Sequence, residues 1–101
     1  MEKLKFRAWN KKNKKMLGDE ITSHLGMFFD NEHIIMQYTG LLDKNGKKIY
    51  QKDLVICYTK NGEKVYKNPQ VVETPEWFKL IWDETNTEVI GNIYQNPELI
   101  K

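Results

Sequence analysis

The chain has 101 residues, a net charge of +2, and three Trp, five Tyr and four Phe. This length suits one domain with one modest core, and the aromatic content excludes an intrinsically disordered chain, which needs few aromatics and a high net charge. The longest apolar runs, such as residues 25–29, fall far short of the roughly 20 residues that span a bilayer, and residues 1–7 lack the apolar stretch of a secretory signal. We therefore expect a cytoplasmic domain without a membrane segment, and the single Cys57 cannot form an internal disulfide.

A strand is predicted at residues 4–9, where apolar and polar side chains alternate. This alternation places Phe6 and Ala8 on a buried face, and Arg7 and Trp9 on the opposite, exposed face. The segment that follows is polar and suits a turn.

The rest of the chain reads as short β-rich runs separated by turn residues. Strands are predicted at 15–17, 25–29, 34–38, 54–59, 64–66, 71–74, 77–82 and 88–94, with a hairpin over 41–50. The hairpin is indicated by Asn45-Gly46, because tight hairpin turns require positive φ. Asn96 and Pro97 predict a short helical turn, with Asn96 as its N-cap.

This spacing of strands and turns indicates an all-β fold, either a small barrel or a sandwich. No convincing helical period of ten residues is present. The side chains that we expect in the core are Phe6, Ile35, Ile49, Val55, Cys57, Leu80, Ile90 and Ile93.

The charge is unevenly distributed along the chain. Residues 1–16 carry seven basic groups and one acidic group, a net +6, and the remainder carries a net −4 from nine basic and thirteen acidic groups. Such polarity can present a basic patch to an anionic partner, but a lysine-rich turn that only keeps the protein in solution has the same pattern.

Three blocks together resemble the YopX family of phage and prophage proteins. They are residues 5–16, residues 36–55 with Gln37-Tyr38-Thr39-Gly40, and residues 89–99 with Ile90-Gly91-Asn92-Ile93-Tyr94. The family usually has Glu-Gly-Asp before the central strand, and this chain has Gln51-Lys52-Asp53. Either the turn here needs no positive φ, or Lys52 tolerates a small strain.

The resemblance implies one YopX-like domain over residues 1–101, with an N-terminal β subregion at 1–40 and an SH3-like barrel subregion at 41–101. It further implies a tendency to self-associate and a role inside an infected or lysogenic bacterium, and it implies no known activity.

The residues favour no enzyme, cofactor or metal site. His24 and His33 have no companions at ligand spacing, so each is better explained as an ordinary polar residue. Cys57 lies in the most apolar strand, where a thiol behaves as a small hydrophobe. Asp53 precedes the same strand and is more consistent with a turn acceptor for backbone N–H groups than with a general base.

Two binding functions remain. A nucleic-acid-binding barrel would use a basic groove with an aromatic platform, and a protein-interaction module would use exposed aromatics and sheet edges. The candidate contacts in either case are Arg7, Trp9, Lys11, Lys12, Lys14 and Lys15. We favour a non-catalytic protein-interaction or assembly module, because the sequence pI of 8.6 is low for a nucleic-acid binder. We expect this module to be a homo-oligomer, with an unknown host or phage protein as a further partner.

Overall fold

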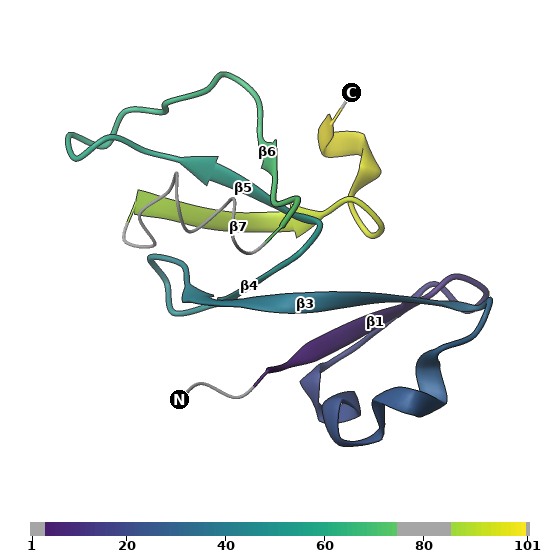
Figure 1. Ribbon diagram of the computed structural model, residues 1–101. Helices are drawn as coiled ribbons and strands as arrows, with labels where there is room; N and C mark the ends of the chain where they lie inside the picture. The colour runs from purple at the N-terminus through teal and green to yellow at the C-terminus, as the bar shows by residue number, and fades with distance from the viewer. Residues whose placement is uncertain (1–3, 75–85, 101) are drawn as a thin grey trace.

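The computed structural model describes residues 4–74 and 86–100 and shows two antiparallel β-sheets (Figure 1). The larger sheet has the strand order β2-β1-β3-β4, and the smaller has the order β6-β5-β7. The strands are β1 Phe6–Asn10, β2 Lys15–Leu17, β3 His33–Leu42, β4 Lys48–Tyr50, β5 Asp53–Cys57, β6 Gln70–Val71 and β7 Thr87–Asn92. Within the described ranges, two 3₁₀ helices accompany them, η1 at Asp19–Phe28 and η3 at Pro97–Ile100. The strand expected at residues 77–82 lies outside the described residues.

The long strand β3 organises the larger sheet. Its first half pairs with β1, from Asn10 opposite His33 to Phe6 opposite Gln37, and its second half pairs with β4. The ladder with β4 is irregular, and Gly40 lies in this stretch with φ 89°. A single strand thus connects the N-terminal hairpin to the middle of the chain.

The predicted hairpin over residues 41–50 is confirmed. Its turn is closed by hydrogen bonds from Gly46 N–H to the Asp43 carbonyl, at 3.0 Å, and from Asp43 N–H to the Lys47 carbonyl, at 2.7 Å. Gly46 alone takes positive φ, 83°, whereas Asn45 does not. The loop is therefore the three-residue kind, a tight turn followed by a left-handed residue, rather than the two-residue kind that needs positive φ twice.

The smaller sheet contains a β-bulge that changes which side chains face inward. Val55 lies opposite Val89 and Leu54 lies opposite Gly91, so Ile90 is the extra residue of β7. Val89 is buried as a result, and Ile90 is only half-buried. The prediction that Ile90 belongs to the core is wrong for this reason.

The core lies chiefly around β5. Ile49, Val55 and Cys57 are buried as predicted, together with Val72 and Val89. The expected core residues Phe6, Ile35 and Ile93 are half-buried instead, because they lie near the ends or the open faces of their strands. Leu80 lies outside the described residues.

The strand predicted at residues 25–29 is also wrong, because this stretch is the second part of η1. The helix is interrupted at His24, whose backbone is not helical, and it buries Ile21 against the sheet. It is fixed to β1 by a hydrogen bond from Phe6 N–H to Thr22 Oγ1, at 3.0 Å. Figure 1 shows η1 on one side of the β1–β3 sheet and the β5–β7 sheet on the other.

The curled strands and the second sheet that packs against them give an all-β, barrel-like architecture (Figure 1). The short helix at the C-terminus is present as predicted, but Asn96 does not cap it: its side-chain oxygen accepts the Asn92 N–H instead, at 3.1 Å. Within the described part of the chain, no helix has the length and apolarity needed to cross a membrane.

Candidate functional site

Four of the predicted contact residues lie together on the turn between β1 and β2 and on the first residue of β2, and we name this segment, residues 11–15, the lysine turn. Lys11, Lys12, Lys14 and Lys15 are all exposed. None of them takes part in the ion pairs found within the described part of the chain. Asn10 shapes the turn, since its carbonyl accepts the Lys14 N–H at 2.8 Å and its side-chain oxygen accepts two further backbone N–H groups. The turn therefore presents four like charges that are free to meet an anionic partner.

Trp9, the predicted aromatic platform, is buried in the structure. Its residue is 8% exposed, and its ring stacks on Tyr94 with centroids 5.9 Å apart and planes 18° apart. Alternation along β1 placed Trp9 on the solvent side, but Tyr94 from the far end of the chain covers that side. The expectation that Trp9 is exposed is wrong, and its contact with a partner stays a prediction.

Arg7 is likewise used inside the molecule. Its guanidinium donates to Asp53 Oδ1 at 2.7 Å and to the Gln51 carbonyl at 3.2 Å, and it lies 4.5 Å from the centroid of the Tyr50 ring. Asp53 accepts the Tyr50 N–H through its other oxygen, at 2.8 Å, which is the turn-acceptor role expected for it. Burial raises the pKa of Asp53, although Arg7 and the Tyr50 N–H act in the opposite direction. Arg7 therefore joins the two sheets.

An apolar surface that the sequence did not predict lies at the end of η1, and we name it the η1 surface. Met27 is 75% exposed and Phe29 is 71% exposed. Beside them is an open pocket of about 350 Å³, which is lined by Phe28, Phe29, Asp30, Asn31, His33 and Ile35. The signal that could have revealed it is the pair of acidic residues at 19–20, which is typical of a helix start, but the apolar run at 25–29 resembled a strand.

The residues considered for catalysis or metal binding are separated in the structure. His24 is exposed on η1, whereas His33 is hydrogen-bonded to Asp30 and Asn10. Burial raises the pKa of the Cys57 thiol to about 11, so the thiolate needed for nucleophilic attack is scarce at neutral pH. Among residues 4–74 and 86–100, no three His, Cys, Asp or Glu side chains are grouped as ligands for a metal ion.

The Ile90-Gly91-Asn92-Ile93-Tyr94 block is accounted for by structure. A Cβ at Gly91 would lie 2.4 Å from Asn96 Oδ1. The Asn92 side chain closes the following turn by accepting the N–H groups of Tyr94 and Gln95, at 3.1 and 2.8 Å. Glycine is needed for the close approach of Asn96, and the asparagine is needed for the turn that brings Tyr94 onto Trp9.

Comparisons with known proteins agree with this architecture. Residues 19–101 match the family model described as YopX protein. No curated protein matches the chain. Among solved structures, the crystal structure of protein EF1440 from Enterococcus faecalis has a TM-score of 0.59 and 22% sequence identity, and the match covers 100% of both chains. An identity of 22% supports a shared fold alone. The family model matches more than half of the sequence, and the chain therefore belongs to the YopX family.

Proposed function

We propose that the protein is a non-catalytic accessory module that acts by binding protein, with a second copy of itself as the first partner and the η1 surface as the contact. The observation that supports this most is the exposure of Met27 and Phe29 beside an open pocket. Exposed large apolar side chains of this kind are typical of protein–protein interfaces, where aromatic residues and Met are enriched.

The roles of the other candidate residues support a binding function rather than catalysis. Asp53 is held between Arg7 and a backbone N–H group, and Cys57 is a buried thiol. His33 does lie at the pocket, but its neighbours are a carboxylate and an amide, and no nucleophilic side chain is among the groups bonded to it.

A second copy is the favoured occupant because of the charge distribution. The net +6 of residues 1–16 includes the lysine turn, which adjoins the η1 surface through a hydrogen bond from Lys11 N–H to the Glu32 carbonyl, at 2.8 Å. The remainder of the chain carries a net −4, so one copy can offer negative charge to the basic end of another. The self-association implied by the YopX resemblance supports the same choice, and the resemblance also supports a role in the cytoplasm of a bacterium that carries the phage.

Sedimentation of the full chain tests the proposal. The wild type should show concentration-dependent self-association, and a variant with Met27→Gln and Phe29→Ser should sediment as a monomer, because buried aromatic anchors carry much of an interface. Val65→Gln is the matched control, since Val65 is exposed in a loop of the other sheet and should leave the oligomer unchanged. A monomeric wild type, or an oligomer that persists in the double variant, would remove the η1 surface as the contact.

A second candidate function, nucleic-acid binding, is favoured by one observation: the four unpaired lysines of the lysine turn. If they contact phosphates of single-stranded DNA, log K should fall with log salt by about 0.7 per contact, and changing all four to Gln should flatten the slope by up to about 3. We expect wild-type binding that is weak and changes little in this variant. Tight, salt-dependent DNA binding that the variant loses, while the oligomer persists, would favour the nucleic-acid function.

A further inference from the structure

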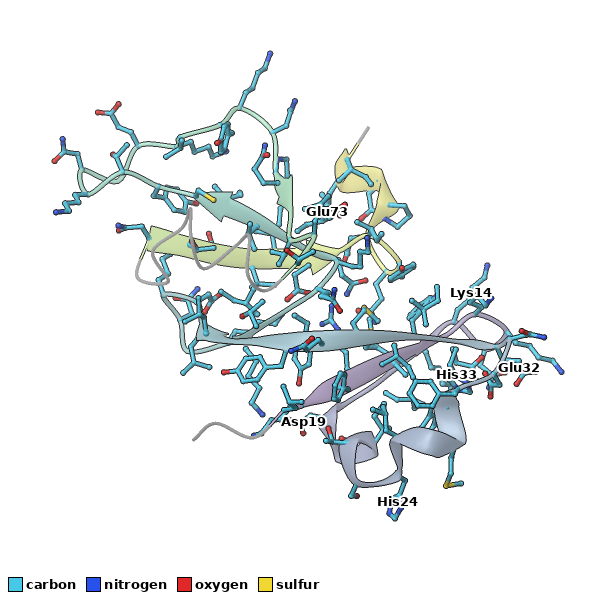
Figure 2. All side chains as sticks on the ribbon, viewed as in Figure 1. Lys14, Asp19, His24, Glu32, His33 and Glu73 are labelled. Atoms are coloured by element: carbon cyan, nitrogen blue, oxygen red, sulfur yellow. The ribbon has the colours of Figure 1, made fainter. Side chains whose placement is uncertain are left out.

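His33 connects the η1 surface to the lysine turn through its two ring nitrogens. Its side chain is 10% exposed. Nδ1 lies 2.9 and 3.1 Å from the two oxygens of Asp30, and Nε2 lies 3.2 Å from Nδ2 of Asn10. The Phe28 ring packs edge-on against the imidazole, with centroids 5.1 Å apart. Figure 2 shows His33 at the same end of the molecule as Lys14 and Glu32, while His24 points outward from η1.

The contacts of Asn10 determine where the proton of His33 lies. The Asn10 side-chain oxygen accepts the N–H groups of Lys12 and Asn13, each at 2.9 Å, so the amide nitrogen is the atom that faces His33. An amide NH₂ group can only donate, so Nε2 must accept. These contacts match a neutral ring that carries its single proton on Nδ1 and donates it to Asp30.

We propose that His33 is an acid-sensitive latch that holds the lysine turn in its closed form only while the imidazole is neutral. Protonation adds a hydrogen to Nε2, which then faces the hydrogens of the Asn10 amide. The Asn10 amide then has two possible arrangements. Its NH₂ group can stay beside the new N–H of Nε2, or the amide can rotate so that its oxygen accepts from Nε2. Rotation turns the NH₂ group toward the N–H groups of Lys12 and Asn13, which lose their acceptor. Either outcome loosens the turn.

The charges that face His33 oppose one another. Asp30, which ends η1, contacts the ring directly, and Glu32 precedes it in the chain; both favour the imidazolium. The lysine turn, packed against the start of β3, disfavours it through Lys11, Lys12, Lys14 and Lys15. The turn is also closed by the hydrogen bond from Lys14 N–H to the Asn10 carbonyl, at 2.8 Å. That bond is opposed by the left-handed conformation of Lys14, φ 54°, which is costly for a residue with a side chain, so losing the Asn10 side-chain acceptor should loosen the turn.

The latch predicts a link between His33 and the backbone of the turn that nuclear magnetic resonance can measure on the full chain. From about pH 8 to about pH 5, where an ordinary histidine titrates, the amide resonances of Lys12 and Asn13 should shift with the same midpoint as the His33 ring. Their protection against hydrogen exchange, measured relative to an unstructured peptide at each pH, should fall roughly tenfold. His24→Gln is the matched control, since this exposed histidine should have no effect on the turn.

Two variants separate the latch from general acid effects. His33→Gln cannot gain a proton and should abolish the pH dependence of both amides. Asn10→Asp should reverse the direction of the pH dependence. A carboxylate can accept hydrogen bonds from the backbone N–H groups and from a protonated Nε2 at the same time, so acid should tighten the turn in this variant. The proposal fails if Lys12 and Asn13 keep their protection while His33 titrates. It also fails if the two amides lose protection equally in His33→Gln.

Discussion

Lys52 shows how a single residue can be strained by the strands around it. It has φ 69°, in the left-handed region that suits glycine. Its N–H donates to the Val72 carbonyl at 2.7 Å, and its carbonyl accepts the Ile93 N–H at 3.1 Å. Both neighbouring strands of the smaller sheet therefore fix its backbone. Of the two explanations for the missing family glycine, the structure supports strain at Lys52.

Replacing Lys52 by glycine should therefore stabilise the protein. Lys52→Gly removes a left-handed conformation that costs about 1 kcal/mol, and it loses only an exposed ion pair with Glu73 that contributes little. Part of the gain is offset because glycine makes the unfolded chain more flexible. We expect the free energy of unfolding in urea to rise by about 0.5–1 kcal/mol. Lys52→Ala is the control, because it loses the ion pair and keeps the strain; if it equals Lys52→Gly, strain is not the cause.

At this scale, the sequence predicted the residues whose roles depend on near neighbours. Asp53 was expected to accept backbone N–H groups, and Val55 and Cys57 were expected in the core, and all three are found so. Arg7 and Trp9 were assigned to a partner because their own partners, Asp53 and Tyr94, come from distant segments that strand alternation does not reveal.

At the scale of elements, the tip of the β3–β4 hairpin is attached to the other sheet by one carboxylate. Asp43 is buried; one oxygen accepts the N–H groups of Asn45 and Lys47, and the other accepts the Val89 N–H at 2.9 Å. Burial raises the pKa of Asp43, but these hydrogen bonds outweigh it and hold the pKa below its ordinary value. Asn45-Gly46 predicted the turn, but no local pattern predicts a bond to β7.

Removing the charge of Asp43 should weaken both the hairpin and its attachment. Asp43→Asn replaces one acceptor oxygen by an NH₂ group, so at least one buried N–H loses its partner, at a cost of about 1–3 kcal/mol at pH 7. The pKa of Asp43 is lower in the folded than in the unfolded protein, where an Asp has a pKa of about 3.9. The carboxylate therefore stabilises the fold at pH values above about 3.9, and this stabilisation is lost as the pH falls through the pKa of the folded state.

Urea unfolding at about pH 7 and about pH 3 measures this effect. The difference between wild type and Asp43→Asn should shrink at the lower pH. As a control, Glu63→Gln changes an exposed acid in the loop after β5, and it should change the free energy of unfolding by less than about 0.5 kcal/mol at pH 7. A difference between wild type and Asp43→Asn that is the same at both pH values would contradict the role assigned to the charge.

Element types were predictable where one pattern was dominant and not where two competed. The stretch 54–59 is rich in β-branched and aromatic residues and lies between turns, so the strand that forms β5 was recognised. Residues 25–29 were taken for a strand because they form a short apolar run between turn residues, yet in the structure Met27 and Phe29 are exposed rather than buried. The η1 surface was missed for the same reason. The bulge at Ile90 was missed because an extra residue leaves the composition of a strand unchanged.

At the scale of the whole molecule, long-range side-chain contacts bind the two sheets to each other. Arg7 of β1 reaches Asp53 of β5. Trp9 of β1 stacks on Tyr94, which follows β7. The N-terminal hairpin is thus attached to the C-terminal sheet by two of its central residues, and we expect the chain to unfold as one cooperative unit.

Breaking the Arg7–Asp53 pair on one side should be more harmful than replacing both partners. The two side chains are 11% and 2% exposed. Arg7→Met keeps the stem against Tyr50 but leaves a buried carboxylate without its cation, which we expect to cost about 3–5 kcal/mol. Asp53→Asn leaves the guanidinium unpaired but retains an oxygen for the Tyr50 N–H. The double variant should cost less than the sum of the singles, by about 1–3 kcal/mol, because neither charge then remains buried alone.

The cycle is measured by urea unfolding at neutral pH, with Glu73→Gln as the control for a pair that contributes little. Glu73 and Lys52 form an exposed pair, so this change should cost less than about 1 kcal/mol. Additive costs for Arg7→Met and Asp53→Asn would show that the two side chains act separately and that the sheets are held by packing alone. If the double variant is about as stable as the wild type, the pair orients the two sheets without adding net stability. The raised pKa of Asp53 agrees with that outcome, because it shows that burial disfavours the charged carboxylate even beside Arg7.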